Sequence, residues 1–187
     1  MKKLLALDIG EVCVKLDQQA VMGELMNAGA DLSLLMPILE ELECGRITED
    51  VFFADIATKL NRDAQYLRDW FGKIIDTEMP GMAKIIERIT PDWNFVFLSD
   101  ISTPHLTICR GKISFFERAR GAVFSFQAGC RKPAAGMYEY FEKHYGMPDL
   151  YIDDRPQNIA AAIERGWPSR QFVSTADLED YFNTLYN

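Results

Sequence analysis

The sequence has little of what marks metal-thiolate or redox proteins. Its cysteines, Cys13, Cys44, Cys109 and Cys130, lie far apart and show neither zinc-ligand nor redox spacing. They are therefore expected to be reduced thiols that serve packing, as is usual in a cytosolic protein. The two histidines stand alone without ligand spacing and receive no role. Internal repeats and low-complexity segments are absent, so neither a repeat array nor a disordered chain is expected.

Positive charge and long apolar runs are also scarce. The chain has 20 lysines and arginines against 28 aspartates and glutamates, a formal net charge of -8 at pH 7. Nucleic acid is not expected as a partner, because its binding needs a basic face. The apolar residues 4–7 are too few for a signal peptide or a membrane span and end at Asp8, which predicts a cytoplasmic protein without a membrane partner. A small phosphorylated metabolite remains compatible with this charge if a cation offsets it.

The pattern of apolar segments predicts an α/β fold. The 187 residues suffice for a real core, and apolar strand-like runs alternate with helical stretches, as in a parallel sheet covered by helices on both faces. The expected strands are residues 4–7, 95–98, 123–126, 150–152 and 171–173. The expected helices are residues 84–90, 104–111, 133–146, 156–166 and 178–186, three of them with proline near the start and glycine near the end.

A second kind of pattern occupies the region between about residues 15 and 80. Strand signals vanish there, and apolar side chains such as Met22, Leu25 and Met26 recur at helical spacing. The pattern predicts a helical subdomain, residues 15–80, inserted into an α/β core domain made of residues 1–14 and 81–187.

Chemically reactive side chains follow four of the expected strands. They are Asp8, Ser99, Lys132 and the pair Asp153 and Asp154. In an open α/β sheet, groups at the carboxyl ends of neighbouring strands converge, so these side chains are expected to share one crevice. Three carboxylates there would repel one another unless a divalent cation neutralised them, and ligation by oxygen alone favours Mg²⁺.

These motifs, in this order, resemble those of the haloacid dehalogenase-like (HAD) hydrolase superfamily. The first motif is matched by Asp-Ile-Gly-Glu-Val at residues 8–12, the second by Ser99, the third by Lys132, and the fourth by Asp153 and Asp154 with Asn158 following. The resemblance covers nearly the whole chain. The insert occupies the position of the cap in the helical-cap subfamily, and Arg-Lys-Pro around Lys132 is similar to a bacterial group resembling alpha-glucose-1-phosphate phosphatase.

The resemblance implies a three-layer α/β/α Rossmann-like fold and a role for each matched residue. The implied activity is magnesium-dependent hydrolysis of a small phosphomonoester, such as a sugar phosphate, through an aspartyl-phosphate intermediate. Asp8 would be the nucleophile. Ser99, Asp100 and Lys132 would bind the phosphoryl group, and Lys132 would neutralise the charge that develops on it. Asp8, Asp153, Asp154 and the main-chain carbonyl of Gly10 would hold Mg²⁺.

One position departs from the family pattern. Many phosphatases of this superfamily carry a second aspartate where this chain has Gly10, and such a general acid is typically worth about 10²–10⁴ in rate. The adjacent Glu11 is the candidate substitute, and Arg46 and Arg155 are candidates for substrate contact. Two alternatives stay open: a 2-haloacid dehalogenase, and a HAD-like protein that binds a ligand without turning it over. The sequence leaves open the substrate and the choice between monomer and homodimer.

Overall fold

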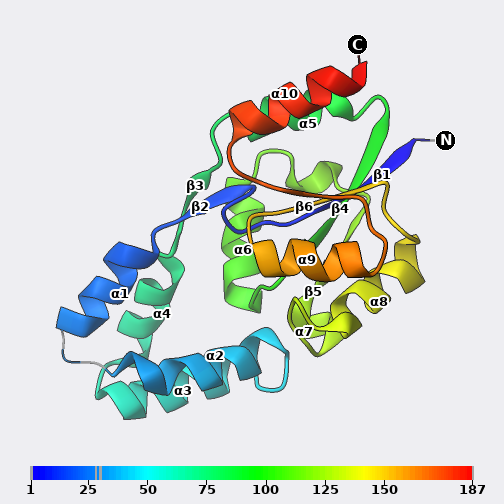
Figure 1. Ribbon diagram of the computed structural model, residues 1–187. Helices are drawn as coiled ribbons and strands as arrows, with labels where there is room; N and C mark the ends of the chain where they lie inside the picture. The colour runs from blue at the N-terminus through cyan, green and yellow to red at the C-terminus, as the bar shows by residue number, and fades with distance from the viewer. Residues whose placement is uncertain (1, 28, 30, 187) are drawn as a thin grey trace.

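The centre of the molecule is a five-stranded parallel sheet (Figure 1). The structure is a computed structural model that describes residues 2–27, 29 and 31–186. The strands are β1 (Lys3–Leu7), β4 (Trp93–Ser99), β5 (Gly121–Phe124), β6 (Leu150–Asp153) and β7 (Ser169–Gln171). Their order in the sheet is β5-β4-β1-β6-β7. Because β1 is central, the residue that follows it emerges between the ends of β4 and β6.

Helices cover both faces of this sheet, which confirms the expected three-layer α/β fold. The alternation of side chains along β1 places Leu5 and Leu7 in one core cluster and Leu4 and Ala6 in another. The first cluster is completed by α5 (Met82–Ile89), α6 (Thr103–Lys112) and α10 (Thr175–Tyr186). The second is completed by α8 (Ala135–Tyr145) and α9 (Pro156–Glu164).

A group of four helices with a core of its own lies beside the sheet (Figure 1). It consists of α1 (Gln18–Asn27), α2 (Leu35–Glu43), α3 (Glu49–Leu60) and α4 (Ala64–Gly72), with the short 3₁₀ helix η1 (Leu32–Leu34) before α2. The antiparallel strands β2 (Val14–Leu16) and β3 (Ile75–Glu78) connect this group to the sheet. The sequence pattern gave no sign of β3, because a four-residue strand is too short to reveal its periodicity.

Two strand predictions were wrong at their ends. The chain after Phe124 turns into α7 (Ser125–Ala128), because Phe124 pairs with Ser99, the last residue of β4, and the Ser125 hydroxyl hydrogen-bonds the main chain of Ile101 instead. The last strand covers Ser169–Gln171, the segment that pairs with β6, whereas residues 172–173 lie beyond it. Both corrections reflect strand pairing partners that a local sequence pattern does not reveal. A second 3₁₀ helix, η2 (Phe116–Arg118), precedes β5.

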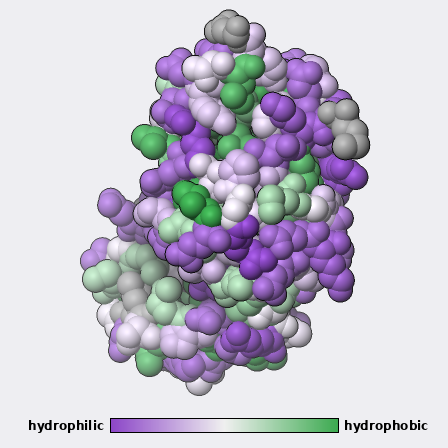
Figure 2. Space-filling model, turned by 45° about the vertical axis from the view of Figure 1, so that its right-hand side comes forward, coloured by the Kyte–Doolittle hydropathy of each residue, from purple (hydrophilic) through white to green (hydrophobic). Residues whose placement is uncertain are grey.

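Figure 2 shows hydrophilic side chains over most of the face in view, with hydrophobic ones in separate patches. In the described part of the chain, no helix has both the length and the apolar character needed to cross a bilayer.

Candidate active site

Asp8 occupies the centre of the carboxyl edge of the sheet, directly after β1. Its main-chain nitrogen donates a hydrogen bond to the carbonyl oxygen of Ile152 in β6, at 3.0 Å. Its Oδ1 accepts a hydrogen bond from the main-chain nitrogen of Ile9 at 2.7 Å, and its carbonyl oxygen accepts one from the thiol of Cys13 at 3.1 Å. The residue is only 7% exposed. These bonds fix a nearly buried carboxylate at the point where the chain leaves the sheet.

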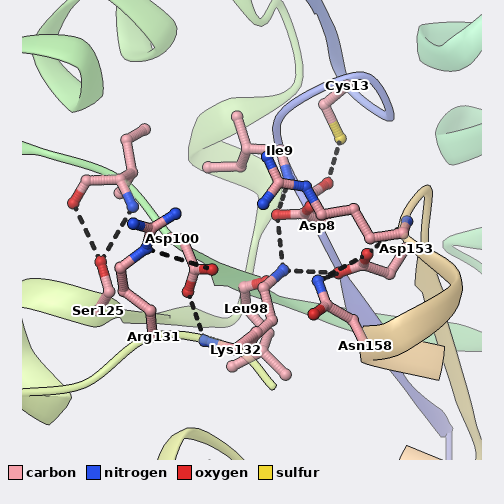
Figure 3. A network of polar contacts seen from close by, with 12 residues as sticks. Asp8, Ile9, Cys13, Leu98, Asp100, Ser125, Arg131, Lys132, Asp153 and Asn158 are labelled. Atoms are coloured by element: carbon pink, nitrogen blue, oxygen red, sulfur yellow. Dashed lines mark hydrogen bonds and ion pairs between the residues drawn. The ribbon is translucent and has the colours of Figure 1, made fainter. Parts of the chain in front are cut away.

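Lys132 lies between two carboxylates (Figure 3). Its Nζ is 3.0 Å from Oδ1 of Asp8 and 2.6 Å from Oδ2 of Asp153. It also donates a hydrogen bond to the carbonyl oxygen of Leu98 in β4, at 2.9 Å. The side chain is 1% exposed. A buried ammonium group therefore joins the ends of three neighbouring strands, and its three donors all have acceptors.

Asp153 is held by further donors from β6 and α9. Its Oδ1 accepts hydrogen bonds from the main-chain nitrogen of Arg155 at 2.8 Å and from Nδ2 of Asn158 at 2.9 Å. Its Oδ2 accepts a hydrogen bond from the hydroxyl of Tyr151 as well as from Lys132. Both oxygens are thus hydrogen-bonded within the protein, which fixes the carboxylate and gives Asn158 a structural role beside the acidic pair.

The charges at this edge of the sheet perturb one another strongly. Burial raises the pKa of Asp8 to about 7, even though Lys132 acts in the opposite direction. Burial also disfavours the charged form of Asp153, but Lys132 outweighs it and holds the pKa of that carboxyl below its ordinary value. Burial would lower the pKa of Lys132, yet Asp8 and Asp153 together raise it. At neutral pH the site therefore holds one cation against an ionised Asp153 and a partly protonated Asp8.

Asp154 adds a third carboxylate to the group. One oxygen each of Asp8, Asp153 and Asp154 lie within 4.8 Å of one another. Partial burial, followed by the neighbouring Asp153, raises the pKa of Asp154. Since a single ammonium faces these acids, the group has the composition of a site for a cation with hard oxygen ligands.

Ser99 and Asp100 end β4 beside the same group. Ser99 is 2% exposed, and its hydroxyl hydrogen-bonds Asp8, which opposes the rise in the pKa of that carboxyl. Oδ1 of Asp100 accepts a hydrogen bond from the main-chain nitrogen of Lys132 at 2.9 Å. Burial raises the pKa of Asp100, while Lys132 lowers it. In this structure Asp100 therefore positions the backbone at Lys132.

Gly10 and Glu11 form the turn after Asp8. Glu11 has a φ of 54°, a left-handed conformation that is uncommon for a residue with a side chain. Its Oε1 accepts a hydrogen bond from the main-chain nitrogen of Leu16 at 3.1 Å, which offsets part of the cost of this conformation. The Glu11 carboxylate, the expected substitute for the missing acid, is therefore hydrogen-bonded to the segment that leads into α1.

A cavity of about 280 Å³ connects these residues with helices α1–α4. Seven of the predicted site residues line it, namely Asp8, Gly10, Glu11, Ser99, Asp100, Lys132 and Asp154, whereas Asp153 lies behind them and is fully buried. Of the two further arginines, Arg155 lines the cavity. Arg46 does not and instead forms an exposed ion pair with Glu41, at 2.6 Å.

The sequence analysis missed one pair in this cavity. Oε2 of Glu43, at the end of α2, lies 3.1 Å from Nε of Arg131, which directly precedes Lys132. Burial raises the pKa of Glu43 to about 7 against the effect of Arg131. No signal in the sequence distinguishes Glu43 from its neighbours Glu40 and Glu41, because only the packing of α2 against the sheet domain turns one of the three inward.

Comparison with known proteins establishes the fold. No protein-family model matches the chain, and no curated protein matches it significantly. A HAD family enzyme from Bacteroides thetaiotaomicron has a TM-score of 0.86 and 16% identity, over 97% of this chain and 98% of that chain. A HAD-like family hydrolase from Porphyromonas gingivalis has a TM-score of 0.84 and 20% identity, over 100% and 98%. The L-2-haloacid dehalogenase from Xanthobacter autotrophicus has a TM-score of 0.63 and 16% identity, over 96% and 82%. This chain has the fold of the haloacid dehalogenase-like superfamily.

Proposed function

We propose that the protein is a magnesium-dependent HAD-like hydrolase that cleaves a small phosphomonoester. The observation that carries this proposal is the buried contact of Lys132 with both Asp8 and Asp153, at the edge of a cavity large enough for a small ligand. The Bacteroides thetaiotaomicron enzyme forms a complex with magnesium and inorganic phosphate. The common fold supports a site for the same two ligands in this chain.

The acidic group fits a divalent cation. Asp8, Asp154 and the carbonyl of Gly10 would be ligands, with Asp153 beside them. Burial and the neighbouring Asp153 raise the pKa of both Asp8 and Asp154, an effect that a bound cation would oppose. Mg²⁺ would supply charge neutralisation and polarisation of a phosphoryl oxygen when bound.

Asp8 would act as the nucleophile. An oxygen of its carboxylate would form a bond to phosphorus, the bond between phosphorus and the ester oxygen would break, and the leaving group would depart with both electrons of that bond. Water would then attack the phosphorus of the aspartyl phosphate, releasing inorganic phosphate and restoring the carboxylate. Lys132 and the hydroxyl of Ser99 would hold the phosphoryl oxygens, where negative charge increases.

Residues 15–80 would act as the cap of this enzyme. The cavity is lined on one side by residues at the carboxyl edge of the sheet and on the other by residues of helices α1–α4. Near Gly45 the loop after α2 reaches the main-chain oxygen of Phe126 so closely that a Cβ would come within 2.5 Å of it. The cap would exclude water from the phosphoryl group in this position and provide the contacts that select the ester.

Phosphate release from a panel of phosphomonoesters, with Mg²⁺ and with a chelator, tests the proposal. The wild type should release phosphate only with the metal, and Asp8→Asn should retain the fold but lose turnover. Asp180→Asn, an exposed acid on α10, is the matched control and should keep full activity. Magnesium-dependent release by Asp8→Asn would contradict the nucleophile assignment.

The same preparation distinguishes the dehalogenase alternative. A dehalogenase would release halide from a 2-haloacid, and the chelator would not affect its rate. The cluster of three carboxylates favours the metal-dependent reaction instead. Ligand binding without turnover of any ester would support the third interpretation, a HAD-like binding protein.

A further inference from the structure

The cavity has two chemically different sides. The sheet domain contributes the charged groups described above. On helices α1–α4, every described residue that lines the cavity is apolar, apart from Gln18 and Glu43. The apolar side includes Met22, Leu35, Leu39, Phe52, Trp70 and Phe71. A ligand whose phosphoryl group lies against Lys132 therefore extends the rest of its structure among these side chains.

The ring nitrogens beside the apolar side chains are hydrogen-bonded within the protein. Nε1 of Trp70 donates to the carbonyl oxygen of Val21 at 2.9 Å. Nε2 of His105 donates to the carbonyl oxygen of Phe71 at 2.9 Å, and the two rings stack with centroids 3.9 Å apart. Burial lowers the pKa of His105 to about 4, so the imidazole is neutral at physiological pH. Glu43 forms an ion pair with Arg131, although Oε2 of Glu43 and Nε of Arg131 are not hydrogen-bonded, and Gln18 is exposed to solvent.

These contacts discriminate against a hydroxylated substrate. A sugar hydroxyl that loses water here without gaining a partner weakens binding by about fivefold to a hundredfold. An aromatic ring would instead find apolar surface and a cluster of rings: Phe71 lies with its centroid 5.2 Å from that of Phe52 and 6.2 Å from that of Trp70. The cavity volume of about 280 Å³ suits a small ligand.

The missing acid at Gly10 leads independently to the same class of ester. A phenol has a pKa near that of tyrosine, about 10. An alkoxide leaving group is far more basic, because its conjugate acid, an alcohol, is a much weaker acid than a phenol and resembles water in this respect. A phenoxide can depart without a proton, whereas an alkoxide depends on a general acid. An aryl ester therefore depends less than an alkyl ester on the general acid that this chain lacks at Gly10.

We propose that the substrate is the phosphate monoester of a small apolar phenol, an aryl phosphate, rather than a sugar phosphate. This inference rests on the phosphatase function proposed above. It assigns the apolar side of the cavity to the aryl ring, with Phe52, Trp70 and Phe71 around it and Met22 at its border.

Three esters distinguish the effect of the apolar cavity lining from the effect of the leaving group. Phenyl phosphate is apolar with a phenoxide leaving group, benzyl phosphate is apolar with an alkoxide leaving group, and glucose 6-phosphate is polar with an alkoxide leaving group. The wild type should show kcat/KM for benzyl phosphate at least about tenfold above that for glucose 6-phosphate, because of the burial of the ring. Phenyl phosphate should be higher still. A kcat/KM for glucose 6-phosphate equal to or above that for benzyl phosphate would overturn the inference.

Two methionines on one helix provide a matched pair of variants. Met22 lines the cavity, whereas Met26, also on α1, is 62% exposed and does not. Met22→Gln should raise KM for both apolar esters about tenfold, and Met26→Gln should leave it unchanged. An unchanged KM in Met22→Gln would count against the assignment of this side to the ring.

Asp8→Asn, measured on all three esters, keeps the two proposals distinguishable. If Asp8→Asn loses turnover on every ester and the wild type prefers the sugar ester, the phosphatase function is supported. The aryl preference is then refuted. Absence of release from all three esters by the wild type would overturn both.

Discussion

Replacing Lys132 by methionine tests the central electrostatic argument. The variant keeps most of the buried aliphatic stem but removes the ammonium group that lies 3.0 Å from Asp8 and 2.6 Å from Asp153. At an effective dielectric constant of about 20, each contact is worth roughly 5–6 kcal/mol before the cost of desolvation is subtracted. Removing one member of a buried ion pair typically costs about 3–5 kcal/mol. We expect a loss of that size, which is a large part of the total stability of a domain.

The loss should depend on pH in a defined direction. Burial raises the pKa of Asp8 to about 7 already with the lysine present, and without it the pKa should rise further. A carboxyl whose pKa is raised by folding destabilises the folded state as pH rises from its unfolded-state pKa to its folded-state pKa, because the unfolded state releases its proton first. Lys132→Met should therefore be closest to the wild type in acid and weakest above neutral pH.

Urea unfolding of metal-free protein, followed by circular dichroism at about pH 5 and about pH 8, measures this effect. Lys143→Met, on the exposed side of α8, is the matched control and should change stability by no more than about 1 kcal/mol. Adding Asp8→Asn to Lys132→Met should restore part of the lost stability, because one of the two unpaired carboxylates is then neutral. A loss below about 1 kcal/mol, or one equal at both pH values, would refute the argument.

Four further predictions concern helices α1–α4, the acidic residues of the site and Gly10. Between about pH 4.5 and 7 the raised pKa of Glu43 lowers wild-type stability, and Glu43→Gln should remove up to about 3 kcal/mol of this dependence in unfolding titrations. Gly45→Ala should lower the thermal midpoint more than Gly129→Ala, because both glycines have positive φ but only the first Cβ would meet a main-chain oxygen of α7. Mg²⁺ at 100 times its Kd should stabilise the wild type by about 2.7 kcal/mol and Asp154→Asn much less. Gly10→Asp, whose Cβ would lie 3.4 Å from Cδ1 of Leu16, should raise kcat for alkyl esters by up to about 10²–10⁴, and equal rates in Gly10→Asn would contradict an acid role.

The sequence determined the fold class and the order of the reactive groups. Strands such as β1 and β4 are runs of buried residues with few polar interruptions, so their positions follow from hydrophobic pattern alone. The carboxyl ends of parallel strands meet at one edge, so the sequence alone predicts that Asp8, Ser99 and Lys132 lie together. Prolines and glycines at helix ends likewise marked α6 and α9 to within a few residues.

The tertiary structure alone decided which groups carry charge and which face the ligand. The pKa of Asp8 depends on its burial and on the distance to Lys132, and neither quantity is a property of the local sequence. Glu43 is one of several glutamates on α2, and only the contact of that helix with Arg131 brings it into the cavity. The apolar lining arises in the same way, because helices distant in sequence must pack before their side chains enclose a common space. Local pattern thus determines which elements form, whereas packing between elements determines the chemistry of the surface that they share.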